Sequence, residues 1–287
     1  MVEAHFQQVN VFGGAGARGN ETGVLFIEGG APDPCHMQSI ARHLDLPDTI
    51  FLDFDPRARE WRGETYSPHE RIGFCVQSLL AAAAALRRAN KVTADAVVPI
   101  NVGGRRYRIE ATPGDGVLEW VALPHRHFEA RKVAIRAGER LCLPSFAGAP
   151  MRVDAGRRRI FVEMSTPRDL DDIDIAPDLA RALLAANDVD GLCFYARLSL
   201  SRLRLRVFTT SLDGGEDRAT GGAAASLAHL VGFGTAGRLT VLQGAAGAHR
   251  RGLLMVKPAA GSDGVVIGGA VRHTPVPDRT FEMPEGV

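Results

Sequence analysis

The sequence has little of several features that define common classes of protein. Only three of its 34 basic residues are lysine, and the formal net charge is +1, so no basic field is present to recruit nucleic acid. No apolar run approaches the roughly 20 residues that are needed to cross a membrane. The four cysteines form no C-x-x-C pair, which argues against a structural zinc site and against a disulfide framework.

Histidines are scattered, and no Cys or carboxylate completes a metal-binding set at ligand spacing. We therefore expect no metal. The first residues lack a basic segment followed by an apolar one, which is the pattern of a signal peptide. We expect a cytoplasmic protein that binds neither nucleic acid nor membranes.

The 287 residues are enough for one or two domains with a large core. Short β-branched or aromatic runs bounded by Gly, Pro and Asp predict many strands, and helical spacing predicts a few helices. The strands are expected at 9–12, 23–27, 50–54, 62–66, 96–102, 105–111, 116–122, 159–164, 191–196, 203–209, 238–242, 252–257 and 264–271. The helices are expected at 34–44, 78–89, 178–186 and 223–231.

Two mostly β halves, each with one apolar helix, indicate an α+β protein of two similar domains. The polar segment 124–131 is the best candidate boundary, which gives domains of 1–125 and 126–287. Gly103-Gly104 is expected to form a two-residue hairpin turn between two strands.

Twice, a strand-like run ends in a polar loop that leads into an alanine-rich helix. The first loop contains Cys75, and the second contains an Asp-x-x-Thr string, Asp217 to Thr220. The start of a helix offers free N–H groups and partial positive charge, so two such ends facing one cleft would bind a small carboxylate. The side chains of the two loops are candidates for proton transfer.

The stretch from Gly14 to Gly19 fits the pattern G-x-G-x-x-G of dinucleotide-binding loops. Such a site needs a helix directly after the loop, whereas here a second strand is predicted. A glycine-rich hairpin is therefore the better interpretation, and a Rossmann oxidoreductase is a remote alternative. Asn20, at the end of the loop, remains a candidate to face a binding site.

Several segments together resemble the phenazine-biosynthesis isomerase (PhzF-like) family, which shares the diaminopimelate epimerase fold. The resemblance extends over essentially the whole chain, and its most specific string is Glu-Asp-x-Ala-Thr-Gly. The segments are Phe12 with Gly19-Asn20, Leu-Pro-Asp-Thr-Ile-Phe at 46–51, Ser67-Pro68 with Gly-Phe-Cys-Val-Gln-Ser at 73–78, Gly-Glu-Asp-Arg-Ala-Thr-Gly-Gly-Ala at 215–223, and Gln243-Gly244 before Arg250.

The resemblance implies two pseudo-symmetric domains, each a β-barrel-like sheet around a central helix, with the site between them. It also implies a homodimer and proton transfer on a small carboxylate without a cofactor. Asp48 stands where the family has its catalytic Glu, Asp217 matches its Asp, and Gln77 stands where it has His. The candidate substrate-binding residues are Asn20, Gln77, Ser78, Thr220, Gly221 and Gly222.

The chain departs from the family pattern at informative positions. Asp48 is one methylene shorter than Glu, Gln77 cannot titrate, and Val76 replaces a Gly. In related epimerases, Cys at the position of Cys75 is one of two thiol bases. Here Thr220 occupies the partner position, and a hydroxyl is a far weaker base than a thiolate. Two-base racemisation is therefore disfavoured, whereas a one-base isomerisation or a dehydration is allowed.

These residues lead to three hypotheses. The first is an isomerase with Asp48 as acid and base, which moves a double bond on a small cyclic unsaturated amino or hydroxy acid. Dihydroxyanthranilate-like rings and pyrroline-2-carboxylates of antibiotic biosynthesis are candidate substrates. The second is a dehydratase or epimerase of a proline-type acid with Cys75 as base, and the third is a non-catalytic binding protein.

The same residues also have structural interpretations. Asp48 can be a solvated turn residue, and Cys75 can be a small buried apolar side chain. Asp217 can be a helix cap or a loop acid, and the small residues at 220–222 can simply allow close packing at a helix start.

Overall fold

The computed structural model describes most of the chain, in two compact units. The described residues are 2–14, 16–28, 33–114, 116–123, 128–138, 146–234, 237–247, 249, 251–261 and 264–283. The first unit comprises Met1–Gly13, Asn20–Ala122 and Gly268–Val287, and the second comprises Gly14–Gly19 and Leu123–Ile267. The boundary predicted between residues 125 and 126 lies outside the described residues.

The strands of the first unit form a closed ring of hydrogen-bonded neighbours. Their order is β17-β1-β2-β3-β4-β6-β7-β8, and β8 pairs with β17 to close the ring. Closure removes the exposed sheet edges that would otherwise pair with other chains. The bounds are β1 Val2–Gly13, β2 Asn20–Glu28, β3 Asp48–Asp55, β4 Glu60–Tyr66, β6 Val98–Val102, β7 Arg105–Gly114, β8 Gly116–Leu123 and β17 Val265–Met283.

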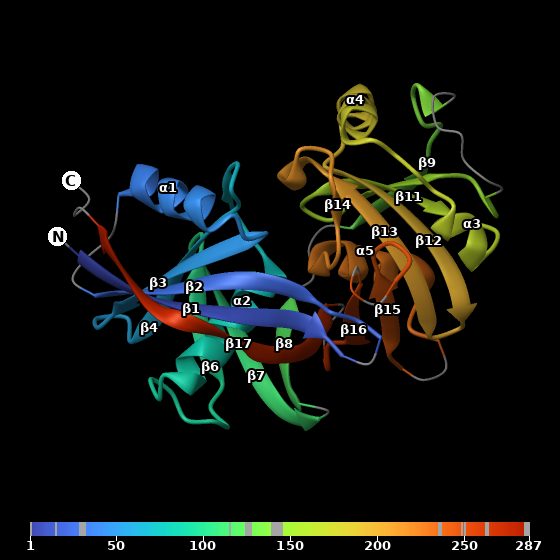
Figure 1. The fold of residues 1–287 in the computed structure, drawn as a ribbon. Coiled ribbons are helices and arrows are strands. Elements are labelled where there is room, and N and C mark those ends of the chain that lie inside the picture. Colours follow the sequence, from blue (N-terminus) through green and yellow to red (C-terminus); the bar gives the residue numbers. More distant parts are fainter. Residues whose placement is uncertain are drawn as a thin grey trace. The chain divides into compact units, whose positions relative to one another are not determined.

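The helix α2, Val76–Arg88, lies among these strands (Figure 1). Each of its residues from Val76 to Leu86 is buried, which agrees with a sequence that is apolar on every side. A run of five alanines in its centre keeps the helix thin. A second helix, α1 at Pro34–Leu44, packs Met37, Ile40 and Ala41 against Phe51 and Tyr66.

A buried ion pair fastens the end of α2 to β8. Nη1 of Arg87 donates to both carboxylate oxygens of Glu119, at 2.6 and 2.7 Å. Nε and Nη2 of Arg87 donate to the carbonyls of Ala94 and Ala96, respectively. Burial raises the pKa of Glu119 from 4.5 to about 7, although the charge of Arg87 acts in the opposite direction.

This shift predicts a pH dependence of stability. The folded state holds the proton of Glu119 to a higher pH than the unfolded chain does. This difference in proton binding stabilises the fold, and the stabilisation is complete below about pH 4.5. The contribution is lost as the pH rises through about 7, and its size is about 3 kcal/mol. We expect urea titrations to show a free energy of unfolding that falls over this interval. Glu119→Gln is expected to remove that fall, and an unchanged slope in the variant would contradict the assignment.

The second unit likewise combines a series of paired strands with a buried helix. Its strands follow the order β9-β10-β11-β12-β13-β15-β16, with the short strand β14 also on β13. The helix α5, Gly221–Val231, is buried at Gly221 and from Ala223 to Ala228. The other bounds are β9 Glu129–Lys132, β10 Met151–Asp154, β11 Arg158–Glu163, α3 Pro167–Asp171, α4 Pro177–Asn187, β12 Gly191–Ser199, β13 Arg202–Thr209, β14 Glu216–Asp217, β15 Leu239–Gln243 and β16 Gly252–Pro258.

The pairing pattern of the two units is the same. In the first, β1, β2, β3, β4, β6 and β7 pair in the sequence antiparallel, parallel, antiparallel, parallel, antiparallel. In the second, β10, β11, β12, β13, β15 and β16 pair identically. The helix α1 connects β2 to β3, and α4 lies in the equivalent connection from β11 to β12. In the same way, α2 lies between β4 and β6, and α5 lies between β13 and β15. The predicted α+β fold with two pseudo-symmetric units is confirmed.

Most of the predicted elements are present. Gly103 and Gly104 have φ of 59° and 77° and join β6 to β7, as a two-residue turn requires. The loop from Gly14 to Gly19 joins two antiparallel strands, so the hairpin interpretation is confirmed. The short elements β5 (Arg71–Ile72), β9, β10, β14 and α3 were not predicted, because a few residues carry little periodicity.

None of the helices in the described part of the chain is long and apolar enough to cross a membrane. Over the same residues, no group of three or more His, Cys, Asp or Glu side chains is arranged to hold a metal ion. Cys35, Cys75 and Cys193 are free cysteines, and Cys142 lies outside the described residues.

Candidate active site

A thiol and a carboxylate meet at the start of the central helix of the first unit. Cys75 is the N-cap residue of α2 in an extended conformation, and Asp48 is the first residue of β3. The Cys75 Sγ donates a hydrogen bond to Asp48 Oδ2 over 3.3 Å. Asp48 is 8% exposed, and Cys75 is partly exposed. The fold thus joins two of the predicted catalytic residues that lie far apart in the sequence.

The charges at this contact favour a protonated thiol. Burial raises the pKa of Cys75 well above 9, and the negative charge of Asp48 raises it further. The hydroxyl and amide of Ser78 act in the opposite direction but do not offset these effects. At neutral pH the thiol therefore donates and the carboxylate accepts, which makes Asp48 the stronger candidate for a base.

Ser78, in the first turn of α2, is fully buried. Its hydroxyl lies beside the Cys75 sulfur, but no hydrogen bond of good geometry satisfies it among the residues that the structure describes. An unsatisfied buried hydroxyl is costly and calls for an explanation, such as a ligand or an ordered water. The predicted binding residue Ser78 therefore lies beside the pair formed by Cys75 and Asp48 and has hydrogen-bonding capacity to spare.

Gln77 ties the start of α2 to β2. Its Oε1 accepts from Asn20 Nδ2 at 3.1 Å, and its Nε2 donates to Thr22 Oγ1 at 2.8 Å and to the carbonyl of Glu21 at 3.3 Å. These bonds use both amide hydrogens, so only the second lone pair of Oε1 is left for a substrate. Gln77 and Asn20, both predicted to bind substrate, are thus joined to each other in the fold.

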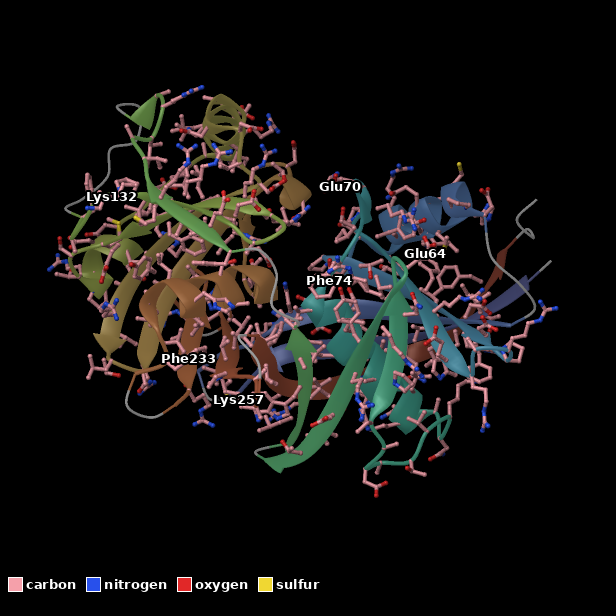
Figure 2. All side chains as sticks on the ribbon, turned by 180° about the vertical axis from the view of Figure 1, so that it is seen from behind. Glu64, Glu70, Phe74, Lys132, Phe233 and Lys257 are labelled. Atoms are coloured by element: carbon pink, nitrogen blue, oxygen red, sulfur yellow. The ribbon has the colours of Figure 1, made fainter. Side chains whose placement is uncertain are left out.

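The loop before α2 is held by an aromatic contact. The rings of Phe74 and Tyr107 lie 4.8 Å apart between centroids and are tilted by 31°. Figure 2 labels Phe74, which directly precedes Cys75. Earlier in the loop, the Ser67 hydroxyl accepts from the amides of His69 and Glu70 and forms a tight turn. These contacts fix the position from which the thiol reaches Asp48.

In the second unit, the equivalent helix start carries Thr220 as its N-cap residue. The Thr220 hydroxyl donates to Asp217 Oδ2 at 2.6 Å, and the Ala219 amide donates to Asp217 Oδ1 at 3.2 Å. In each unit, then, the N-cap side chain of the central helix donates to a carboxylate. Asp217 is the last residue of β14 and is not the N-cap of α5. Gly221 and Gly222 form the first turn of that helix.

Gln243 is a site residue that the sequence analysis did not select. It is buried at the end of β15, its Oε1 accepts from the Thr220 amide at 2.9 Å, and its Nε2 donates to Thr220 Oγ1 and to the Asp217 carbonyl, both at 2.8 Å. The Thr220 hydroxyl therefore has a donor and an acceptor already, which leaves it unsuited to be a base. The Gln243-Gly244 string was a signal that could have identified the residue.

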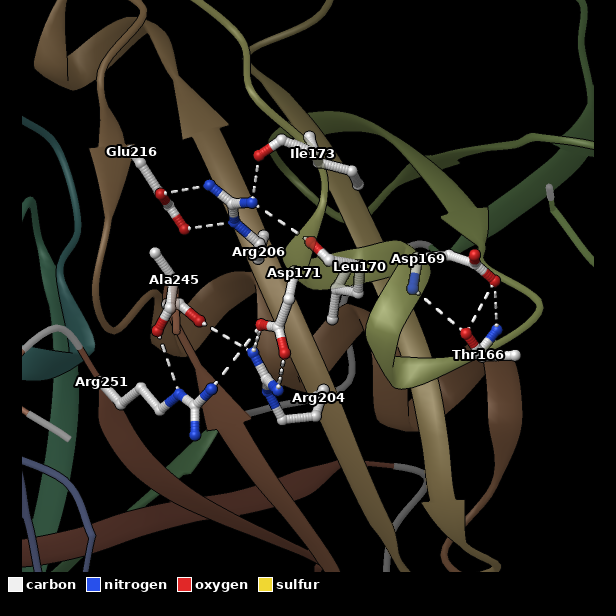
Figure 3. Close-up of polar contacts among 11 residues, drawn as sticks. Thr166, Asp169, Leu170, Asp171, Ile173, Arg204, Arg206, Glu216, Ala245 and Arg251 are labelled. Carbon is white, nitrogen blue, oxygen red and sulfur yellow. Dashed lines mark hydrogen bonds and ion pairs between the residues drawn. The ribbon is translucent and has the colours of Figure 1, made fainter. Parts of the chain in front are cut away.

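A network of ion pairs positions the strand that carries Asp217 (Figure 3). Arg206 Nε and Nη2 donate to the two carboxylate oxygens of Glu216 at 2.9 and 2.8 Å, and Arg206 Nη1 donates to the carbonyls of Leu170 and Ile173. Both side chains are largely buried. Because Glu216 precedes Asp217 in β14, this bidentate pair fixes the loop in front of α5.

Comparisons with solved structures show relatives of the fold. A predicted epimerase of Pseudomonas aeruginosa has 22% identity and a TM-score of 0.76, over 99% of this chain and 100% of that chain. A PhzF-family protein of Bacillus anthracis has 15% identity and a TM-score of 0.78, over 99% and 100%. A hydroxyproline epimerase of Agrobacterium vitis, with bound trans-4-hydroxy-L-proline, has 14% identity and a TM-score of 0.59, over 97% and 92%.

At these identities the structural likeness concerns the fold, which PhzF-family proteins share with epimerases of proline-type acids. Among curated proteins, none gives a significant match. The family model described as phenazine biosynthesis-like protein, PhzC-PhzF, matches residues 9–271. The chain therefore belongs to the phenazine biosynthesis-like (PhzC-PhzF) family.

Proposed function

We propose that the protein is a cofactor-independent isomerase that relocates a proton, and with it a double bond, on a small cyclic unsaturated amino or hydroxy acid. Membership of the PhzC-PhzF family supports an isomerase or epimerase role in general. The observation that carries the finer proposal is the hydrogen bond from the Cys75 thiol to the buried carboxylate of Asp48.

In this mechanism Asp48 removes a proton from an activated ring carbon. The electron pair of the broken C–H bond forms a new C=C bond, and the π pair of the old double bond forms a new C–H bond at its far carbon with the proton of Asp48, which exchanges with solvent between the two steps. Cys75 keeps its proton and orients the carboxylate through its hydrogen bond. A single base that both removes and returns the proton needs no second thiol, which is consistent with Thr220 in the other unit.

The proposed substrates are dihydroxyanthranilate-like rings and pyrroline-2-carboxylates of specialised metabolism, including antibiotic and phenazine biosynthesis. We propose that Asp217 and Gln77 hold an amino or hydroxyl group, that Asn20 and Ser78 help to place the ring, and that the Thr220-Gly221-Gly222 backbone binds the carboxylate. The bound hydroxyproline in the related epimerase supports an acid of this size. A homodimer in the cytoplasm is part of the proposal.

The proposal is tested by offering the purified protein a panel of such acids. We expect proton NMR to show conversion of at least one cyclic unsaturated acid to its double-bond isomer, with no added metal or nucleotide. The saturated ring acid serves as the control, because it has no allylic position and should not react. Conversion of the saturated acid would favour an epimerase over double-bond relocation, and conversion of none of the panel would count against an isomerase.

A second enzyme function keeps Cys75 as the base of a dehydratase or epimerase of a proline-type acid, and the fold of the hydroxyproline epimerase favours it. Cys75→Ser separates the two. Serine can still donate to Asp48 but is a much weaker base than a thiolate, so we expect kcat of the isomerisation to stay within about tenfold, as for loss of one hydrogen bond of ordinary strength. A loss of a thousandfold or more would favour the thiol base.

The third hypothesis is a binding protein in which Val76 and Gln77 mark lost chemistry. Tight binding of a ring acid, with no solvent hydrogen entering any bound acid, would favour this function over both enzymes.

A further inference from the structure

Three arginines of the second unit are almost fully buried, and they differ in their partners. Arg204 donates to Asp171 at 2.6 and 3.2 Å, and Arg206 forms the bidentate pair with Glu216 (Figure 3). Arg159, in β11, is 6% exposed. Within the described ranges its guanidinium has neither a hydrogen bond nor an ion pair, and it is therefore the exception among the three. A buried guanidinium without a partner is strongly unfavourable.

Two glycines make room for the Arg159 side chain. A Cβ on Gly191 would lie 3.3 Å from Arg159 Cγ, and a Cβ on Gly222 would lie 3.2 Å from Arg159 Nη2. The aliphatic part of the side chain thus passes over β12, and the guanidinium reaches the first turn of α5. The Cα–Cβ bond of a helical residue tilts toward the N-terminus, so the space beside this Cβ, where the guanidinium lies, belongs to the first turn of α5.

Asp190 and Asp217 act on Arg159 through their charge, but among the described residues neither forms an ion pair with its guanidinium. Asp217 accepts from Thr220 and Ala219, and Asp190 accepts from the Arg158 amide. Arg157 adds a further positive charge, and burial raises the pKa of Cys193 to about 12, which keeps that thiol neutral. Burial lowers the pKa of Arg159, with Asp190 and Asp217 opposing this from a distance.

The helix start beside the guanidinium also lacks an anion. The first turn of α5 contains no acidic residue, and Thr220 makes no side-chain cap. Gln243 uses the Thr220 amide, but among the described residues nothing accepts from the amides of Gly221 and Gly222. A cation at the positive end of a helix dipole is repelled. Desolvation, the missing partner and the dipole are three unfavourable effects that one bound anion would relieve.

We propose that the Arg159 guanidinium and the amides of Gly221 and Gly222 together bind the carboxylate of a small acid. This inference rests on the proposed function only in making that acid the substrate. The guanidinium offers two parallel N–H groups that match the two oxygens of a carboxylate, and the helix start adds backbone donors. Thr220 and Gly222 are partly exposed, so a ligand can approach the helix start from solvent.

The inference is tested with two pairs of probes measured by isothermal titration calorimetry. Anthranilate and pyrrole-2-carboxylate carry the carboxylate, and anthranilamide and pyrrole-2-carboxamide replace it with a neutral amide of similar shape. Arg159→Met removes the charge and keeps most of the side-chain volume. Arg157→Met is the matched control, because it removes the same charge from a neighbouring residue of the chain.

We expect the parent to bind at least one of the carboxylates and to bind its amide much more weakly. Arg159→Met is expected to weaken carboxylate binding by about 10- to 100-fold, the size of effect of a hydrogen bond to a charged group, and to leave amide binding unchanged. Arg157→Met should bind like the parent. Equal carboxylate affinity in the parent and Arg159→Met would overturn the inference, as would a parent that binds neither carboxylate.

Thermal stability measured without ligand tests whether Arg159 has only a structural role. Removing a buried charge that has no partner is neutral or stabilising, so the Tm of Arg159→Met should equal or exceed that of the parent. A large fall in Tm would show that Arg159 serves folding instead. If binding depends on Arg159 while no acid is isomerised, the carboxylate site stands and the proposed isomerase fails. If isomerisation continues in Arg159→Met with unchanged KM, the proposed isomerase stands and the role of Arg159 in binding the carboxylate fails.

Discussion

Replacing Asp48 with asparagine is expected to lower kcat for double-bond isomerisation by about a hundred- to ten-thousandfold. A positioned general base contributes roughly a hundred- to ten-thousandfold, and an amide cannot take up the proton. Asparagine has the same shape as aspartate and still offers an oxygen to the Cys75 thiol, which donates to Oδ2 over 3.3 Å in the parent. The fold should therefore persist, and circular dichroism with thermal melting would verify that it does.

Asp48→Glu provides the informative companion variant. It introduces the longer carboxylate of the family pattern at this position. It therefore tests how far the carboxylate must extend toward the substrate, without removing the base. We expect Asp48→Glu to keep measurable isomerisation with an altered choice among ring acids, because a displacement of about 1 Å at a reacting group changes rates by about a hundredfold. An Asp48→Asn enzyme within tenfold of the parent would refute Asp48 as the base.

Replacing Arg206 with methionine is expected to lower the free energy of unfolding by about 3–5 kcal/mol. The change leaves Glu216 without its bidentate partner in a largely buried position, which is the costly way to break such a pair. It also leaves the carbonyls of Leu170 and Ile173 without the hydrogens that Arg206 donates. Urea unfolding followed by fluorescence or circular dichroism measures the loss.

The double variant with Arg206→Met and Glu216→Leu is the matched control, because it replaces both charges with apolar side chains of similar size. We expect the double variant to recover much of the stability lost by the single one, which gives a strongly non-additive cycle. A single variant that loses less than about 1 kcal/mol would mean that the pair does not hold β14. The position of Asp217 would then need another explanation.

The elements that the sequence predicted are those with a strong period or strong turn chemistry. A helix was expected at 78–89 because its apolar residues cover every side, and the structure has it at Val76–Arg88. The strands around it were expected from their β-branched runs. The Gly103-Gly104 turn followed from the need for positive φ at both positions. The sequence did not predict that the last strand belongs to the first unit. That assignment depends on the pairing of β17 with β1, which joins opposite ends of the chain.

The sequence indicates Asp48 and Cys75 as candidate residues but does not reveal their contact. Their hydrogen bond depends on how β3 packs against the start of α2. Arg159 was missed because it follows two other arginines, a run that usually lies in solvent. It becomes distinctive only once the fold brings Gly191 and Gly222 beneath it. Gln243 was missed because its role lies in contacts with a distant loop.

The measurement that tests the central claim most directly is solvent-deuterium incorporation during turnover, followed by mass spectrometry and NMR. In D₂O we predict that the parent and Cys75→Ser place deuterium on the ring carbon that gains a proton, at most one atom per turnover, whereas Asp48→Asn leaves the acid unlabelled. Labelling by Asp48→Asn at the parent's rate would contradict the account. So would labelling that depends on Cys75 and is indifferent to Asp48.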